Sequence, residues 1–193
     1  VYGYNYNNFK ENTVANIDND QPQTRATSYD VGRQNINITK NGDYVVTGSN
    51  KGSLNRVTVK GNITANITIK DVNIYVKDSP EPGEYVIGAI DLRDGATVNL
   101  TIEGNNYLRG GNAGSGIQVP KGCTLRITDK STGSLESYGG PCGAGIGAPG
   151  NISGKEEKDV GTIIIDGGTI IARGNAEGVS STCLLYTSDA ADD

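Results

Sequence analysis

The chain has 193 residues, which is enough for one domain with a sizeable core or for two small domains. It contains no histidine, and this excludes a Ser-His-Asp or Cys-His catalytic system and a histidine-ligated zinc site within this chain. Its 17 basic residues are outnumbered by 22 acidic ones, which argues against a nucleic-acid partner. No apolar run approaches the length of about 18 residues that a membrane span requires, so we expect no such span.

The first part of the chain, residues 1–32, is polar and has no apolar period, so we expect a leader or linker there. The first strand-like runs are residues 36–39 and 43–48. Asn41 and Gly42, which separate them, are a hairpin-type turn signal.

An internal repeat follows. Residues 56–71 align without a gap with residues 89–104, at an offset of 33 residues. A third copy lies in residues 116–129, and a fourth begins at residues 144–150, takes a charged insertion at 154–160 and resumes at 161–167. A fifth copy starts at residues 177–179, with Val179 as its apolar position.

Apolar and polar residues alternate within each copy, which is the period of a β-strand, and each copy shows three such runs. In the third copy the runs are GIQV, TLRIT and SLESY. One copy cannot bury its own apolar face, whereas stacked copies can. The pattern therefore predicts an all-β fold, a parallel β-helix (a β-solenoid) of about four to five coils, truncated, over residues 33–182; its right-handed form is what the family resemblance described below implies. An antiparallel β-sandwich is the alternative. The predicted inward columns are Val57/Ile90/Ile117/Ile146/Val179, Ile67/Leu100/Leu125/Ile163 and Ile69/Ile102/Ile127/Ile165.

These repeats carry a family resemblance. The segments that carry it are TANITIKDVNI, ATVNLTIEGNN, GIQVPKGCTLRITD, GAGIG and GTIIIDGGTIIA. Together they resemble bacterial secreted and cell-surface proteins with pectate-lyase-like right-handed β-helix repeats, of the carbohydrate-binding or adhesin-like kind. The resemblance covers roughly residues 33–180, and it implies an extracellular or cell-surface location.

The last segment differs from the rest of the chain. Residues 183–193, CLLYTSDAADD, resemble a translated sequencing adaptor, so we expect them to be an artefact that packs on nothing. Without them two cysteines remain, Cys123 and Cys142, and the sequence does not decide whether these two pair.

Two groups of charged residues are candidates for chemistry. Lys70 and Glu103 are equivalent positions of neighbouring copies, with Asp166 expected further along the same column. Asp91 and Arg93 are expected, with Asp94, just after a strand. The resemblance implies that polysaccharide lyases of this fold use an arginine or lysine base, with carboxylates that hold calcium. An exposed column of surface charges is the simpler interpretation, so we expect no catalytic residue and no metal or other cofactor.

Two sets of polar side chains recur with the repeat. Asn66 with Asn99, and Asn73 with Asn106, are expected to stack as amide ladders. Three tyrosines also recur near the repeat length and would form an aromatic stripe for sugar rings if they share one face, although burial is the alternative. They are Tyr75, Tyr107 and Tyr138.

Taken together, the sequence predicts a non-catalytic extracellular surface module that binds a polysaccharide or a cell-surface glycan. Two alternatives remain: a truncated polysaccharide lyase or glycosidase of the same fold, and a purely structural or phage-type attachment module.

Overall fold

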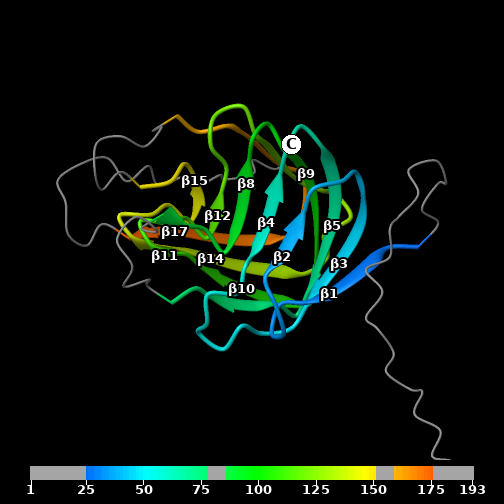
Figure 1. Cartoon of the computed structure of the whole chain (residues 1–193), viewed down its shortest axis with the longest axis horizontal. Helices are drawn as coiled ribbons and strands as arrows, with labels where there is room; N and C mark the ends of the chain where they lie inside the picture. The colour runs from blue at the N-terminus through cyan, green and yellow to red at the C-terminus, as the bar shows by residue number, and fades with distance from the viewer. Residues whose placement is uncertain (1–24, 78–85, 151–158, 176–193) are drawn as a thin grey trace, which may run out of the picture.

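A computed structural model describes residues 25–77, 86–150 and 159–175 of the chain. These residues form β-strands and no helix (Figure 1). The described residues do not include the first 24 residues of the predicted leader, most of the charged insertion, Val179 or residues 183–193.

Three parallel sheets contain almost all of the strands (Figure 1). Sheet A consists, in spatial order, of β1 (Thr27–Asp30), β3 (Gly42–Thr47), β5 (Thr64–Lys70), β9 (Thr97–Glu103), β13 (Thr124–Ile127) and β16 (Thr162–Ile165). Sheet B consists of β15 (Ile146–Gly147), β12 (Ile117–Gln118), β8 (Ile90–Arg93), β4 (Val57–Lys60) and β2 (Ile36–Ile38). Sheet C consists of β17 (Thr169–Asn175), β14 (Ser134–Pro141), β10 (Asn105–Arg109) and β6 (Asn73–Tyr75). A short antiparallel pair joins β7 (Val86–Ile87) to β11 (Gly111–Asn112).

The described strands visit the three sheets in a fixed order. From β4 onward the chain passes through sheets B, A and C in turn, and it does so four times, ending with β15, β16 and β17. Each strand pairs in parallel with the corresponding strand of the neighbouring copy. The all-β class and the parallel pairing are thus as the repeat predicts, and the arrangement is compatible with a β-helix.

The turn at Asn41 and Gly42 does not form a hairpin. The strand before it, β2, pairs with β4 in sheet B, whereas the strand after it, β3, pairs with β1 and β5 in sheet A. The turn is therefore a corner between two sheets. An Asn-Gly pair indicates that the chain changes direction, but it does not determine which strands pair with each other.

The 33-residue offset of the first two full copies is confirmed by the strand register. Val57 pairs with Ile90 in sheet B, and the pairing continues through Ile117 to Ile146. In sheet A, β5 pairs with β9 from Thr64–Thr97 through to Lys70–Glu103. Successive copies therefore place like residues side by side over both sheets.

The predicted columns of the third and fourth copies in sheet A are wrong by two residues. Leu125 pairs with Val98 and Ile163, and Ile127 pairs with Leu100 and Ile165. Ile69 and Ile102 do share a column, but Ile127 and Ile165 belong to the next one. A shift of two residues returns every side chain to the same face, so the apolar alternation alone could not detect it.

The inward faces of the three sheets enclose one hydrophobic core. Its fully buried members come from all three sheets, and they are mostly isoleucine, valine and leucine, the residues that suit a pleated surface. The largest of them are Ile36, Ile38, Ile67, Ile69, Ile74, Ile90, Leu92, Leu100, Ile102, Leu108, Ile117 and Leu125. Cys123 is buried at the edge of this core, and it forms no disulfide bond with the half-buried Cys142.

Glycines allow the backbones of successive copies to pack closely at the corner between sheets C and B. A Cβ atom on Gly114 would overlap the carbonyl oxygen of Ile87, and one on Gly143 would overlap the carbonyl oxygen of Gly114. Any larger residue would force successive copies apart at this corner. This close approach explains part of the high glycine content of the chain.

The ordered sheet begins earlier than the predicted boundary at residue 33. Strand β1 pairs with β3 from Thr27–Tyr44 to Asp30–Thr47, and Val31 is fully buried. Thr27, Ser28 and Asp30 are polar, so this edge strand shows no clear alternation of apolar residues in the sequence. Much of its stabilisation comes instead from backbone pairing.

Candidate functional site

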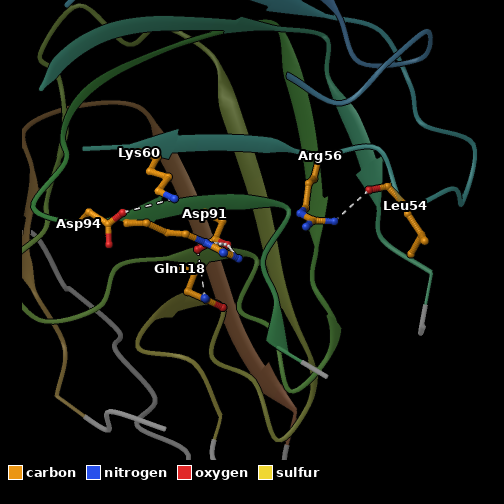
Figure 2. A network of polar contacts seen from close by, with 7 residues as sticks. Leu54, Arg56, Lys60, Asp91, Asp94 and Gln118 are labelled. Carbon is orange, nitrogen blue, oxygen red and sulfur yellow. Dashed lines mark hydrogen bonds and ion pairs between the residues drawn. The ribbon is translucent and has the colours of Figure 1, made fainter. Parts of the chain in front are cut away.

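A buried acidic residue lies on sheet B, in strand β8. The Asp91 side chain is 0% exposed, and its Oδ2 atom accepts a hydrogen bond of 2.7 Å from Nε of Arg93. The Arg93 Nη2 atom lies 2.5 Å from the same oxygen. On the neighbouring strand β12, Gln118 donates from Nε2 to Asp91 Oδ1 at 3.1 Å (Figure 2). Two partners thus hold both carboxylate oxygens.

Burial has the largest effect on the pKa of Asp91. Removal of the carboxyl group from water raises its pKa above the usual value, although Arg93 and Gln118 both favour the charged form and act to lower it. Two atoms around it, Nε of Arg56 and Oε1 of Gln118, are buried without a hydrogen-bond partner. The network is therefore a largely buried polar cluster with two unsatisfied atoms rather than an open charged surface.

The surface charge column predicted from Lys70, Glu103, Asp91 and Arg93 needs correction. Lys70 and Glu103 do pair across β5 and β9 in sheet A, with Nζ and Oε2 3.5 Å apart and both side chains about half exposed. Asp91 and Arg93, however, lie within strand β8 of sheet B, and Asp91 is buried. They belong to another sheet, so the four residues do not form one column.

Two further acidic residues are also ion-paired. Asp166, which was expected in the Lys70 column, instead binds Arg126 on β13, with Oδ2 and Nε 2.6 Å apart. Asp94 lies within 3.9 Å of Lys60 on the exposed rim of sheet B (Figure 2). In the part of the chain that the structure describes, no three cysteine or acidic side chains gather closely enough to hold a metal ion.

The outward face of sheet A carries an amide ladder. Nδ2 of Asn99 donates to Oδ1 of Asn66 at 2.8 Å, and Nδ2 of Asn66 donates to Oδ1 of Asp43 at 2.8 Å. The predicted stacking of Asn66 on Asn99 is confirmed. This ladder lines an open groove of about 520 Å³, bordered also by Thr68, Thr101, Arg126, Thr128, Asp129 and Lys130.

The second predicted amide pair does not form. Asn73 pairs with Tyr107, because the second copy has one more residue than the first between its strands in sheets A and C. Asn106 points inward and is 4% exposed. Its Oδ1 accepts from the Val72 amide at 2.9 Å, and its Nδ2 donates to the carbonyl oxygens of Glu103 and Ser134 at 2.9 and 3.2 Å. One side chain thus connects three copies of the repeat.

Replacement of Asn106 by leucine is expected to lower the free energy of unfolding by about 2–3 kcal/mol, because it leaves the buried Val72 amide without its partner and removes the hydrogen bonds to the carbonyl oxygens of Glu103 and Ser134. Chemical denaturation monitored by circular dichroism measures this loss. Asn66→Leu, which removes only exposed hydrogen bonds, is the matched control and should cost less than about 1 kcal/mol. Equal losses in the two variants would show that Asn106 does not hold the copies together.

All three predicted tyrosines lie on the outward face of sheet C. Tyr75 on β6 is 41% exposed, and Tyr107 on β10 and Tyr138 on β14 are half-buried. The Tyr107 and Tyr138 ring centres lie 5.4 Å apart. Burial, the alternative interpretation, assumed that Tyr107 aligns with Ile74, but Leu108 takes that position.

Arginines alternate with these tyrosines across the sheet. The register places Tyr75, Arg109, Tyr138 and Arg173 side by side on β6, β10, β14 and β17. The Arg109 guanidinium lies 4.6 Å from the centre of the Tyr75 ring, and that of Arg173 lies 6.0 Å from the Tyr138 ring. We call these four residues and Tyr107 the Tyr/Arg face. The arginines were missed because their equivalence to the tyrosines appears only in the strand register.

No known protein family, curated protein or solved structure matches this chain. The candidate sites therefore have to be compared on their own geometry. Polar groups of the sheet A groove already bind one another, through the amide ladder and the Arg126–Asp166 ion pair. On the Tyr/Arg face, neither guanidinium group has a carboxylate partner among the described residues, whereas the Tyr138 hydroxyl donates to Glu136.

The described residues include no helix that is long and apolar enough to cross a membrane.

Proposed function

We propose that this chain forms a right-handed parallel β-helix of about four to five coils that acts as a non-catalytic surface module outside the cell, and that its Tyr/Arg face binds a polysaccharide. The repeated B, A, C strand order and the parallel register support the β-helix. The resemblance of the repeats to secreted and cell-surface proteins supports the location.

The Tyr/Arg face is the observation that carries the binding proposal. Sugars are recognised by flat aromatic surfaces that contact their C–H groups and by donors and acceptors that reach their hydroxyls. Tyr75, Tyr107 and Tyr138 supply both, because each ring carries a phenolic oxygen. The Tyr138 hydroxyl donates to Oε2 of Glu136 at 2.9 Å, and this hydrogen bond raises the pKa of the phenol, which therefore stays protonated.

The charged residues support a binding module more than an enzyme. A general acid or base must reach the reacting group, and Asp91 is fully buried behind Arg93 and Gln118. Lys70 and Glu103 neutralise each other on an exposed strand pair, which is typical of a surface ion pair. Both features favour structural roles for the residues that a lyase would use.

Replacement of Tyr138 by alanine is expected to weaken polysaccharide binding about tenfold, because it removes the ring that contacts both Tyr107 and Arg173. Affinity electrophoresis of the full chain in gels that contain pectins, soluble cellulose derivatives or host-type glycans measures the change. Leu54→Ala, which truncates an exposed apolar side chain outside this face, is the control and should bind normally.

The same polymers test the absence of catalysis. Incubation with the full chain, with and without calcium, should release no unsaturated or reducing ends. Released ends that disappear in Lys70→Ala or Arg93→Ala would contradict the non-catalytic proposal. Failure of the chain to retard in any of the gels would contradict the binding proposal.

A further inference from the structure

We propose that the Tyr/Arg face selects acidic polysaccharides, those with carboxylate or sulfate groups along the chain, and that Arg109 and Arg173 are the residues that select them. This inference rests on the proposed function and adds the chemical class of the ligand. The inference concerns the charge of the ligand, because contact with the aromatic rings alone would not require a charged sugar.

The charges of this face favour an anionic ligand. Neither Arg109 nor Arg173 forms an ion pair within the described residues, whereas Arg33, Arg93 and Arg126 each do. The only acidic neighbour in the register is Glu136, whose carboxylate accepts from the Tyr138 hydroxyl. Two guanidinium groups against one carboxylate leave a net positive face on a chain whose formal net charge is −5. An anionic ligand complements that charge.

Both arginines also lie over tyrosine rings. Stacking on the rings of Tyr75 and Tyr138 restricts the guanidinium groups, so less conformational freedom is lost when they bind. A guanidinium group matches the two oxygens of a carboxylate or a sulfate with parallel hydrogen bonds. Nη1 of Arg109 is buried, so a ligand has to bind the other nitrogen atoms of this guanidinium group.

The spacing of the arginines suits a polymer with regularly placed charges. Arg109 on β10 and Arg173 on β17 lie on either side of β14, hence two strand spacings or about 10 Å apart. This distance is comparable to the span of a disaccharide unit. The ring of Tyr138 lies between them on β14, where it can contact the sugar that separates two acidic groups. A linear acidic polysaccharide would therefore lie across the strands of sheet C.

Polygalacturonate and its fully methyl-esterified form are the matched ligands that test this inference, because they share one backbone and differ in the carboxylate charge. We expect the full chain to bind polygalacturonate at least fivefold more tightly than the ester in low salt, and to lose this preference as the salt concentration rises. Chondroitin sulfate and desulfated chondroitin, measured in the same way, distinguish sulfate from carboxylate as the preferred group. Isothermal titration calorimetry gives all of these affinities.

The protein variants are chosen to separate local charge from net charge. Arg109→Gln and Arg173→Gln should each weaken polygalacturonate binding at least fivefold and leave binding of the ester unchanged. Arg33→Gln removes the same charge from the turn that follows β1, where Arg33 is exposed beside Asp30, and should have no effect. Arg173→Lys keeps the charge but loses the planar fork, so it should restore only part of the affinity. Thermal unfolding of each variant confirms that the fold is retained.

The outcomes separate this inference from the proposed function. Equal, salt-independent binding of the acid and the ester would overturn the selection of acidic polymers while polysaccharide binding stands. Equal weakening by Arg33→Gln and Arg173→Gln would also overturn it, since net charge would then explain the preference. Absence of binding to every polymer would overturn the proposed function and this inference together.

Discussion

Ile102→Asp is expected to abolish the cooperative unfolding transition of this protein. Ile102 is 0% exposed in β9, pairs with Ile69, and its backbone amide donates to Oγ of Ser131 at 3.1 Å. An aspartate there would be a buried charge without a cation to pair with, a change that costs more than about 5 kcal/mol and equals much of the stability of a typical domain. Circular dichroism during thermal and urea denaturation measures the transition.

Two control variants show whether the loss of stability comes from the buried charge. Ile102→Val removes one methylene group from the same site and should cost only about 1 kcal/mol. Thr64→Asp places the same charge on an exposed position of the neighbouring strand β5 and should change stability by less than about 0.5 kcal/mol. A folded Ile102→Asp variant with a melting temperature near that of the unmodified chain would contradict the core described above.

Arg93→Ala should produce the second large effect, and this effect should depend on pH. Removal of the guanidinium group leaves the buried Asp91 carboxylate with Gln118 as its only side-chain hydrogen-bond partner among the described residues. Loss of one member of a fully buried ion pair costs about 3–5 kcal/mol, and we expect about 2 kcal/mol here because the Arg93 side chain is itself 45% exposed. Lys60→Ala, which breaks the exposed pair with Asp94, should cost less than about 1 kcal/mol.

The pH dependence follows from the raised pKa of Asp91. Because the folded pKa lies above the unfolded value of about 3.9, the folded state binds more protons between these two values. The free energy of unfolding therefore falls as the pH rises through that interval. Arg93→Ala removes a contact that lowers this pKa, so the interval extends to higher pH in the variant. The deficit in its free energy of unfolding, relative to the unmodified chain, should therefore shrink as the pH falls from 7 towards 4. A deficit that is constant over this range would show that the Asp91 charge is not its cause.

The repeat made the pairing of the first two full copies predictable. The segment from Arg56 to Asp71 matches the segment from Ala89 to Gly104 without a gap, and both strands of each segment pair as that alignment requires. The alignment includes polar matches such as Asn66 with Asn99, which an incorrect register would break. Local alternation and repeated identity therefore point to the same pairing.

Other parts of the register could not be read in this way. Leu125 and Ile127 fit equally well at two positions that differ by one strand period, so hydrophobicity could not choose between them. The extra residue before Tyr107 shifts the second copy by one position in sheet C, and it reverses the expected faces of Asn106 and Tyr107. In both cases the geometry of a corner decides the outcome, and the sequence of a single copy carries little information about it.

Burial of polar side chains was the hardest feature to predict for the candidate sites. Asp91 looked like a surface residue because charged side chains are seldom fully buried. Its burial depends on Arg93 in the same strand and on Gln118 in the next copy. The Tyr/Arg face likewise exists only because residues 29 to 35 positions apart in the chain become neighbours in sheet C.

The tyrosines and arginines of sheet C follow one another from strand to strand, so their row runs along the direction in which the copies are stacked. Each additional copy of the repeat that keeps this pattern would extend the row by one strand. A long polymer could then occupy many weak sites at once, and the residence time would rise through avidity although no single contact became stronger. The number of copies would then set how firmly the protein holds the polysaccharide that we propose as its ligand.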